Sequence, residues 1–553
     1  MEAITSKMWV KEVYVDNFKC FKGEFNLKLN ENLNIIVGNN EAGKSTILEA
    51  INLALSGVIN GKYIRNELSQ YLFNNQITIE YIESLGTGNP ISPPRITIEL
   101  YLEGDNLAQL EGDGNKKRER ACGVSLIIEI DEQYQSEYEQ LIRTGELKSI
   151  PIEYYTINWR SFAREKITAR SIPLKSSLID SSTHRYQSGS DVYISRIVKD
   201  HLDTEDIVAI SQAHRKLKEG FIADPSIAAI NTKLRDATNI SEKEIKVSVD
   251  LSSNNAWETS LMTYLDEVPF HYIGKGEQTI IKTKLSLSHK KTQEANIILL
   301  EEPENHLSHS LLNHLIHDLK QENINKQVLI STHNSFVANK LGLGNLILLH
   351  DQTTMTFENL TDDTKEFFEK LSGYNTLRLL LCKKAILVEG DSDELVVQKV
   401  YKVNHGGKLP IEDGVDVISV GLSFLRFLEI AEKINKQVVV VTDNDGDIEA
   451  IEKKYENYLD ENAKEFIMIC YDSEIDECPE IDEKFFNCNT MEPKLVKANS
   501  LEKMNEVLDK DFEDLIALHK FMKGNKTDCA LKIFKFEGEV SYPQYILDAI
   551  ADE

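Results

Sequence analysis

The sequence predicts an α/β protein of two or three domains, and three observations lead to that prediction. Residues 33–37 form an apolar strand that runs into a glycine-rich loop and then a helix. Residues 297–300 form a second apolar strand, which ends in glutamates. From about residue 380, strands and helices alternate again with a different set of motifs. Such alternation is typical of parallel sheets covered by helices, whose strand ends gather ligands.

Residues 38–45 read Gly-Asn-Asn-Glu-Ala-Gly-Lys-Ser and match a P-loop at every fixed position. The glycines let backbone N–H groups turn toward phosphate oxygens at the start of the helix expected over residues 46–55. Lys44 is expected to reach the β- and γ-phosphates, and the Ser45 hydroxyl to bind Mg²⁺. The sequence therefore predicts binding of a nucleoside triphosphate. The residues expected to contact the nucleotide are Gly38, Asn39, Asn40, Glu41, Ala42, Gly43, Lys44, Ser45 and Thr46.

The paired glutamates that follow the second apolar strand have the form of a Walker B motif. Glu301 is expected to hold the water shell of Mg²⁺, and Glu302 to polarise the water that attacks the γ-phosphate. Residues 328–333 form another apolar strand that ends in His333, which can contact the γ-phosphate and sense hydrolysis. A glycine-rich signature upstream is expected to face a nucleotide bound to a second subunit, through Gly274, Gly276 and Glu277.

Other periodic segments divide the chain further. Strands are expected near 94–102, 123–130 and 152–157, and residues 11–58 are expected to form two strands, the P-loop and its helix. A helical insertion is expected over 189–236, where Ile194, Ile197, Val198 and Leu202 have helical spacing and Pro225 interrupts the pattern. The predicted domains are a nucleotide-binding part at 1–180 and 246–375, a helical dimerisation insertion at 181–245, and a second domain at 376–553.

Acidic residues follow two strands of that second domain. Glu389 comes directly after the strand at 385–388, and Asp443, Asp445 and Asp447 follow the apolar strand at 438–441. Each motif alone is also compatible with an ordinary acidic turn. Two carboxylate-ended strands in one parallel sheet, however, form a dense anionic cluster, which is costly unless it holds hard divalent cations. The sequence thus predicts a second site that uses Mg²⁺ or Mn²⁺.

The order of P-loop, signature, Walker B and strand-end histidine resembles the ABC ATPase heads of SMC- and RecF-like proteins. Residues 380–500 resemble a Toprim domain, with Gly421 after the intervening strand. An ABC head followed by Toprim resembles the OLD (overcoming lysogenisation defect) family, including Gabija-type and retron-associated phage-defence nucleases. The fold implied is an SMC/RecF-like head with a helical insertion, followed by a Rossmann-like Toprim domain. Departures include Glu301, where such heads often have Asp, and Gly274-Lys275 in place of Ser-Gly.

The resemblance implies an ATP-regulated, divalent-metal-dependent DNA endonuclease or nickase in antiviral defence. Glu389 would be a metal ligand or base, while Asp443 and Asp445 hold the first Mg²⁺ or Mn²⁺. Candidates for the second ion are Asp393, Asp447 and Glu492. Lys526 stands where the family has a lysine near the scissile phosphate, and a solvated loop lysine is the alternative for this residue. The implied partners are DNA and a second copy of the chain, as a homodimer or a higher homo-oligomer. A helicase, or a retron reverse transcriptase with its DNA, is a further candidate.

Composition limits the alternatives. The net charge of −28 disfavours broad coating of DNA, although Lys116-Lys117-Arg118 and residues 159–164 are locally basic. No apolar run is long enough to span a membrane, and the cysteines lack metal-ligand spacing, so a cytoplasmic protein is expected. The open alternatives are a RecF- or SMC-like repair ATPase with a non-catalytic Toprim module, a primase or topoisomerase, and a scaffold for a partner effector.

Overall fold

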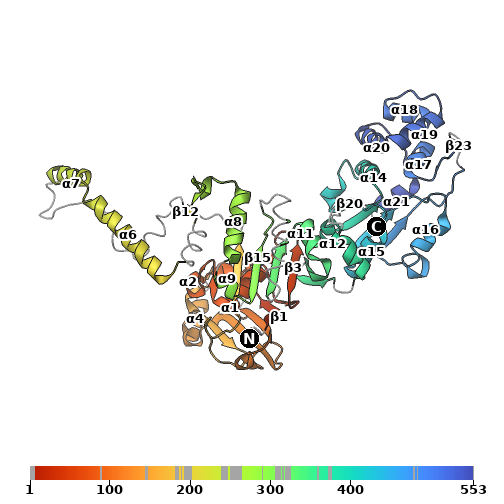
Figure 1. Ribbon diagram of the computed structural model, residues 1–553. Coiled ribbons are helices and arrows are strands. Elements are labelled where there is room, and N and C mark those ends of the chain that lie inside the picture. Colours follow the sequence, from red (N-terminus) through yellow and green to blue (C-terminus); the bar gives the residue numbers. More distant parts are fainter. Residues whose placement is uncertain are drawn as a thin grey trace, which may run out of the picture. The chain divides into compact units, whose positions relative to one another are not determined.

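The computed structural model describes residues 7–86, 90–143, 147–180, 186–187, 190–191, 202–237, 247–248, 264–288, 290–305, 313, 317, 326–350, 352–357, 360–370, 376–477, 480–481 and 484–551. The chain divides into two compact units. The first comprises Met1–Ile36, Asn40–Thr332 and Asp351–Thr353, and the second Val37–Asn39, His333–His350 and Thr354–Glu553. Figure 1 labels the elements within each unit. The predicted domain boundaries remain predictions.

The first sheet is antiparallel and has the order β2-β1-β6-β8-β7, with β9 pairing β8. Its strands are β1 (Met8–Asp16), β2 (Glu24–Lys28), β6 (Ile96–Gly104), β7 (Glu111–Gly112), β8 (Ala121–Ile130) and β9 (Tyr155–Ser161). The strands expected near 94–102 and 123–130 are thus confirmed as β6 and β8, whereas the one expected at 152–157 begins only at Tyr155, as β9, because Ile152–Tyr154 form a 3-10 turn. Residues 11–58 contain one strand more than expected, because β1, β2 and β3 (Leu33–Gly38) all precede the P-loop helix.

Strand β6 is buried on both faces over most of its length, although its alternating sequence predicted a half-buried strand. One face packs against the P-loop helix α1 (Lys44–Ser56). On the other face, Tyr101 clusters with Tyr14 and Phe162, and Glu99 accepts a hydrogen bond from the backbone N–H of Lys116 at 2.9 Å. The alternating sequence of β6 therefore reflects two faces that are lined by different kinds of side chain, and both faces are buried.

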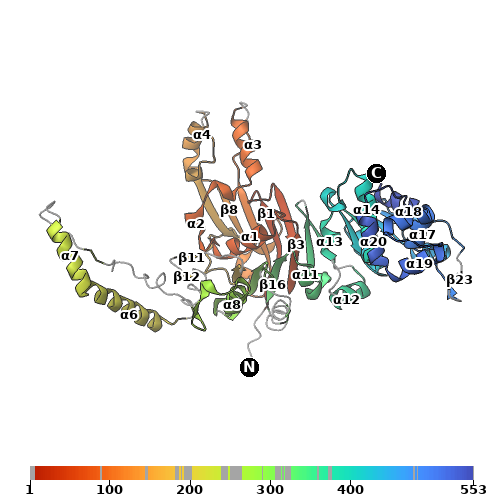
Figure 2. The same ribbon diagram turned by 90° about the horizontal axis from the view of Figure 1, so that it is seen from above.

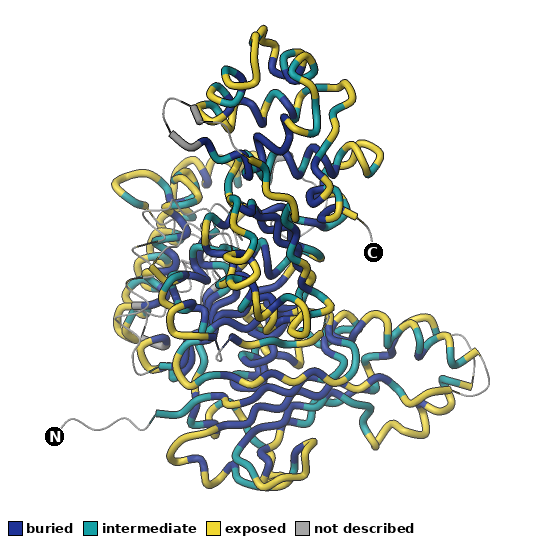
Figure 3. Tube along the Cα trace, turned by 90° about the vertical axis from the view of Figure 1, so that its right-hand side faces the viewer, coloured by how far each residue is buried: buried dark blue, intermediate teal, exposed yellow. Residues whose placement is uncertain are grey.

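The second sheet has the order β10-β15-β16-β3-β17-β18, and β10, β15 and β16 run parallel. Besides β3, the strands of this sheet are β10 (Ser176–Asp180), β15 (Ile297–Glu301), β16 (Gln327–Thr332), β17 (Leu346–His350) and β18 (Thr353–Thr356). Helix α1 lies between the two sheets, since it contacts β6 and β8 of the first and β10, β15 and β16 of the second. Figure 3 shows the strands as mostly buried and the peripheral helices and loops as largely exposed.

Peripheral helices extend from this core. Helices α3 (Asn75–Leu85) and α4 (Gln135–Arg143) project together in Figure 2, and the buried hydroxyls of Tyr81 and Tyr138 lie 2.6 Å apart between them. The remaining elements before the C-terminal sheet are β4 (Val58–Ile59), β5 (Lys62–Tyr63), α2 (Ile64–Glu67), β11 (Tyr186–Gln187), β12 (Ser190–Asp191), β13 (Tyr264–Leu265), β14 (Val268–Pro269), α8 (Lys275–Ser288), α9 (Lys290–Glu294), α11 (Ser335–Leu341), α12 (Asp362–Lys370) and α13 (Thr376–Leu381).

The expected helical insertion contains α6 (Thr204–Ile222) and α7 (Pro225–Ala237). Pro225 is the first residue of α7, where its fixed φ and missing N–H favour a new helix rather than a continued one. The Ile194, Ile197 and Val198 positions, on which the helical spacing was based, lie outside the described residues. None of the helices in the described ranges is long and apolar enough to cross a membrane.

The C-terminal sheet is parallel, with the order β20-β19-β21-β22, and confirms the alternation expected from about residue 380. Its strands are β19 (Lys384–Val388), β20 (Val415–Ser419), β21 (Gln437–Val441) and β22 (Ile467–Cys470). A short pair, β23 (Glu480–Ile481) and β24 (Lys484–Phe485), follows. The helices are α14 (Asp391–Asn404), α15 (Phe424–Lys433), α16 (Ile448–Lys454), α17 (Met491–Ala498), α18 (Leu501–Leu508), α19 (Leu515–Gly524), α20 (Lys526–Lys535) and α21 (Gln544–Ile550).

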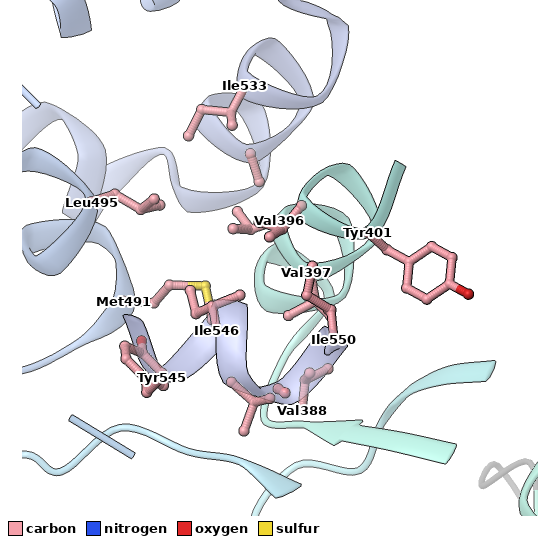
Figure 4. Packing of buried hydrophobic residues seen from close by; sticks show 14 of the residues in the cluster. Val388, Val396, Val397, Tyr401, Met491, Leu495, Ile533, Tyr545, Ile546 and Ile550 are labelled. Carbon is pink, nitrogen blue, oxygen red and sulfur yellow. The ribbon is translucent and has the colours of Figure 1, made fainter. Parts of the chain in front are cut away.

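Helices α14 and α21 pack beside each other on this sheet. Figure 4 shows Val396 and Val397 of α14 close to Ile546 and Ile550 of α21, with Val388 of β19 beneath them. All five side chains are almost fully buried. The same apolar cluster continues into α17, α19 and α20 through Leu495, Met522 and Ile533. It therefore fixes the strand ends and the C-terminal helices as one body, which matters because both contribute to the acidic site described below.

Candidate nucleotide site and carboxylate cluster

The P-loop connects the end of β3 to the start of α1, as the sequence predicted. Gly43 has a φ of +103°, and a Cβ there would lie 2.7 Å from the Phe21 ring and 2.9 Å from the Cys20 sulfur. Only glycine fits this position, for conformational and steric reasons together. Glu41 also has a positive φ, of 67°, which costs more for a residue with a side chain. The loop is thus held in the turned-in conformation that phosphate binding requires.

Lys44, at the start of α1, lies close to the glutamates that follow β15. Burial lowers the pKa of its ammonium, whereas Glu302, Glu304 and Glu301 act in the opposite direction. The structure therefore brings the P-loop lysine and the predicted Walker B acids together, although they are far apart in the chain. Their proximity is the arrangement expected for a site that holds a triphosphate and Mg²⁺.

Strands β15 and β16 are parallel and in register, so that Glu301 pairs with Ser331 and His333 follows directly after β16. Glu302 has a φ of 39°, its backbone N–H donates to the Ser331 carbonyl at 2.9 Å, and its carboxylate accepts from the Asn305 amide at 2.8 Å. Strained φ values in non-glycine residues concentrate at functional sites. The geometry is consistent with a carboxylate held in one position for catalysis.

Glu304 is a residue that the motif analysis did not assign a role. Its side chain is buried, contributes to the electrostatics of Lys44, and accepts a hydrogen bond from the Thr332 hydroxyl at 2.5 Å. Thr332 is the last residue of β16. The pair therefore ties the end of β16 to the turn after β15. The only sequence signal for Glu304 was the repeated acid in Glu-Glu-Pro-Glu at residues 301–304.

The glycine-rich signature begins helix α8, which confirms that it precedes a helix. Gly274, Lys275 and Glu277 are exposed, whereas Gln278 is buried and donates from its amide to the Ile273 carbonyl at 2.8 Å. Nothing lies within 4 Å of a Cβ built on Gly274. The segment is accessible to a second molecule, and its contact with a nucleotide across a dimer stays a prediction.

The acids of the C-terminal sheet converge on one edge. Glu389 follows β19 directly, and Asp443 lies just beyond β21, the neighbouring parallel strand. Burial raises the pKa of Asp443 well above its ordinary value, and Asp393, Glu492, Glu389 and Asp445 raise it further by repulsion. We call these five side chains the carboxylate cluster. Their mutual repulsion shows that acids from distant parts of the chain meet there.

Two other members of the carboxylate cluster show the same repulsion. Burial raises the pKa of Asp393 to about 6, with Glu492 and Glu389 contributing, while the N–H of Gly390 donates to its carboxylate at 2.9 Å. Partial desolvation and Asp445 raise the pKa of Glu389. Groups whose ionisation is suppressed in this way are typical of sites that bind cations or exchange protons.

Two lysines counter the negative charge of the cluster. The Lys526 ammonium lies 3.0 Å from each carboxylate oxygen of Glu492. Against the lowering effect of burial, Glu492, Asp393 and Asp443 raise the pKa of Lys526. Lys526 thus lies at the start of α20 beside the acids, with its side chain 46% exposed. Lys454, which the sequence analysis missed, interacts with Glu389 and Asp445. No motif around Lys454 signals this role.

Backbone contacts position the strand-end acids. The N–H of Gly421 donates to the Glu389 carbonyl at 3.0 Å, and Gly421 has a φ of 58°. Asp445 has a φ of 49°, and its carboxylate accepts a hydrogen bond from the Asn487 amide at 2.8 Å. Asn444, between the two aspartates, is buried and donates to the carbonyls of Asp472 and Glu474. The turn after β21 is therefore rigidly held.

Asp447 has a different environment from the other predicted metal ligands. Its side chain is exposed and caps α16, accepting from the Ala450 N–H at 2.9 Å. It does not appear among the acids that raise the pKa of Asp443. In the described part of the chain, no three His, Cys, Asp or Glu side chains stand close enough to hold a metal ion as they are oriented here. The donor chemistry of the carboxylate cluster nevertheless fits Mg²⁺ or Mn²⁺, which prefer carboxylate oxygens.

The acidic loop after β22 is neutralised by lysines of α17. Lys494 has a side chain only 3% exposed and pairs with Asp472 at 2.9 Å and Asp476 at 2.7 Å. Lys497 is 51% exposed and pairs with Asp476 at 2.7 Å and Glu474 at 2.9 Å. The two lysines therefore share an acid but differ in burial, which makes them a matched pair for mutagenesis.

We expect Lys494→Met to destabilise the C-terminal sheet by about 3–5 kcal/mol, because it leaves two half-buried carboxylates without their buried partner. Lys497→Met should cost about 1 kcal/mol or less, since Lys497 is itself 51% exposed and Asp476 keeps its pair with the buried Lys494. Native-state hydrogen exchange of the β21 and β22 amides measures both changes. Equal protection in the two variants would contradict this account of the loop.

The locally basic segments noted in the sequence are largely ion-paired. Lys116 pairs with Glu24 at 2.6 Å, Lys117 with Glu12 at 2.5 Å, and Arg164 with Asp113 at 2.8 Å. Lys117 also lies over the Tyr101 ring, 4.9 Å from its centroid.

Comparisons with known proteins agree with the two sites. The model of the AAA ATPase domain family matches residues 8–338, and that of the overcoming lysogenization defect protein-like TOPRIM domain matches residues 380–445. The fold and sites define an ATPase head joined to a Toprim domain. The chain belongs to the AAA ATPase domain family, and its two matched domains together correspond to an OLD-family ATPase–Toprim protein. None of the curated proteins compared with it matches.

The chain also has low similarity to several solved structures. They include the SMC head domain from Thermotoga maritima, at 13% identity over 62% of this chain and 97% of that one, with a TM-score of 0.27. The Smc head from Pyrococcus furiosus is 15% identical over 63% and 95%, with a TM-score of 0.29. The RecF–ATP structure is 12% identical over 64% and 100%, with a TM-score of 0.33.

Proposed function

We propose that the protein is an ATP-regulated, divalent-metal-dependent DNA endonuclease or nickase that serves in antiviral defence. The observation that carries this proposal is the carboxylate cluster, with Lys526 beside it, at the carboxyl end of a parallel Toprim sheet. A module that only binds DNA has no need to bring five acids together, because their repulsion costs stability. The correspondence to the OLD family supports the same activity.

In the nuclease site, Glu389, Asp443 and Asp445 would hold one ion, and Asp393 and Glu492 the other. Two bound Mg²⁺ or Mn²⁺ ions supply an activated water and stabilise the leaving oxygen. Lys526 offers its ammonium to a phosphate oxygen from its place beside Glu492. Asn487 keeps the Asp445 carboxylate oriented toward the site. Lys454 adds positive charge near Glu389, where a phosphodiester would approach.

In the ATPase site, backbone N–H groups of the loop that ends at Gly43 would receive the phosphates, and Lys44 would donate to the β- and γ-oxygens. Ser45 and Glu301 would hold Mg²⁺, which neutralises phosphate charge when bound. Glu302 orients the attacking water, and Asn305 holds its carboxylate. His333, which follows β16 directly, would contact the γ-phosphate.

The test of the nuclease is incubation of the purified protein with supercoiled plasmid in Mg²⁺ or Mn²⁺, with and without ATP. Conversion to open circles supports the proposal, and chelation with EDTA should stop it. A RecF- or SMC-like repair ATPase with a non-catalytic Toprim module is the second candidate. It is favoured by the absence, among the described residues, of three ligand-type side chains already grouped to hold a metal ion. Plasmid that stays supercoiled under all these conditions would favour it.

We expect ATP to change the nicking rate by about 5- to 150-fold, the range typical of coupling between two sites. The expected direction is inhibition, because a defence nuclease must stay quiet in a healthy cell that is rich in ATP. The measurement is the nicking rate against ATP concentration for the natural protein and for Lys44→Ala. Flat and superimposable curves would show that the ATPase does not control the nuclease.

The proposal also includes a homodimer or higher homo-oligomer in the cytoplasm, completed through the signature at α8 and the insertion. Exposed apolar side chains support an interface on the insertion, namely Val208, Leu217 and Phe221 on α6 and Ile230 on α7. The proposed domains are the ATPase at 1–180 and 246–375, the insertion at 181–245 and the nuclease at 376–553. A helicase or a retron reverse transcriptase with its DNA remains a proposed partner beyond the DNA substrate.

A further inference from the structure

A cavity of about 80 Å³ lies beside the carboxylate cluster, among the loop before α17, α17 itself and α19. The proposed cleavage chemistry does not use this space. Two residues belong to both the cavity and the cluster, since Glu492 and Lys526 line the cavity and form the ion pair described above. A third lining residue, Asn487, hydrogen-bonds the Asp445 carboxylate at 2.8 Å. The cavity therefore opens from the wall of the cluster itself.

The lining of the cavity combines flat aromatic side chains, polar groups and a cation. The rings of Phe486 and His519 contact each other with centroids 5.2 Å apart and planes tilted by 45°, and the Lys523 ammonium lies 5.4 Å from the Phe486 centroid. Thr490 contributes a hydroxyl and Asn487 an amide. A nucleobase is recognised by an aromatic side chain against its π-face and by hydrogen-bonding groups at its edge. Lysines contact the phosphates that adjoin it.

The size of the cavity agrees with this chemistry. At roughly 10–15 Å³ for each water-sized group, 80 Å³ has room for about five to eight of them. A pyrimidine ring with its substituents is of that size. The volume is too small for a base pair, so a duplex can use the cavity only if one base leaves the stack.

We propose that this cavity receives one unpaired nucleobase of the DNA substrate, next to the phosphodiester held at the carboxylate cluster. The inference rests on the proposed nuclease function and names its substrate class, which is DNA with a mismatched, bulged or single-stranded nucleotide. Extracting a base from a duplex costs free energy, and least when the base is already unpaired. The enzyme should therefore prefer damaged or irregular duplexes and single-stranded segments over perfect ones.

The test measures binding without cleavage, in Glu389→Ala protein with Mg²⁺, by fluorescence anisotropy. Three duplexes of one sequence are compared: fully paired, with a one-nucleotide bulge, and with the same bulge lacking its base. We expect the bulge to bind about 5- to 150-fold more tightly than its abasic counterpart, the range found for a base on an aromatic side chain. Equal affinities for these two duplexes would overturn the proposal. Because no cleavage is needed, this result is independent of whether the protein is a nuclease.

Variants locate the effect in the cavity. His519→Ala should lose most of the preference for the base, and Phe486→Leu, which keeps an apolar side chain, should weaken it as well. Lys520→Ala, an exposed position on the same helix that does not line the cavity, should retain the full preference. Thermal unfolding confirms that each variant is folded. If His519→Ala and Phe486→Leu both keep the preference, the base lies elsewhere and the inference is wrong.

A free nucleotide is the other source of the same chemistry. Deoxynucleoside monophosphates at millimolar concentration are added to the bulged-duplex complex of the Glu389→Ala protein. They should displace little of the duplex, because the adjoining phosphates of DNA add contacts that a single nucleotide lacks. Tight binding of the monophosphate combined with equal affinity for the bulged and abasic duplexes would assign the cavity to a small-molecule nucleotide instead.

Discussion

Replacing Glu389 or Asp443 by alanine is expected to reduce DNA nicking by about 10²- to 10⁴-fold while ATP hydrolysis continues. Removing one ligand from a two-metal site costs several kcal/mol of transition-state stabilisation, and about 1.4 kcal/mol corresponds to each factor of ten. The measurement is the initial rate of plasmid nicking in Mg²⁺ and in Mn²⁺, with phosphate release from ATP followed in parallel.

Asp391→Ala is the matched control for these variants. Asp391 lies two residues from Glu389, is exposed at the start of α14, and is not among the acids that repel Asp443. It should nick DNA at nearly the natural rate. Nicking that survives in both Glu389→Ala and Asp443→Ala would place the cleavage site outside the carboxylate cluster.

Lys44→Ala is expected to abolish ATP binding, whereas Glu302→Gln should bind ATP and fail to hydrolyse it. The Lys44 ammonium offsets the negative charge of the phosphates, so removing it weakens the binding of ATP. Glu302→Gln keeps a side chain of similar shape that no longer polarises the attacking water. The substitution therefore slows ATP hydrolysis and leaves ATP binding intact. Equilibrium binding of labelled ATP and the steady-state rate of phosphate release separate the two effects.

Lys62→Ala is the control for Lys44→Ala, because Lys62 is an exposed lysine of β5 that follows α1 and pairs with Glu67 at the surface. It should bind and hydrolyse ATP normally. Equal ATP affinity in the natural protein and in Lys44→Ala would show that residues 38–45 are not the nucleotide site.

Sequence and structure agree most closely where a motif is local. The P-loop, the strand that ends in Glu301 and the strand that precedes Asp443 all lie where their residues predicted them. Local patterns also predicted the helix α8 and the interruption of the helical insertion at Pro225. These features depend on backbone conformation and hydrophobic periodicity over a few residues, and both can be read along the chain.

Expectations were less complete where distant segments meet. The sequence could not decide between a solvated and a functional Lys526, and gave no sign of Lys454. It included Asp447 among the metal ligands, although its side chain caps a helix. Strand β6 looked half-exposed because alternation does not show what covers the second face.

What the sequence alone determined is the set of chemistries: a P-loop ATPase head, a Toprim sheet with carboxylate-ended strands, and their order along the chain. What only the tertiary structure decided is which side chains share a site. Glu492 and Lys526 reach the strand ends because α17 and α20 pack through one apolar cluster with α14 and α21. The proposed base cavity exists for the same reason, since Asn487 and Thr490 come from the loop before α17 and His519 comes from α19. Burial and repulsion act through space, so their partners depend on packing and are not recorded in sequence spacing.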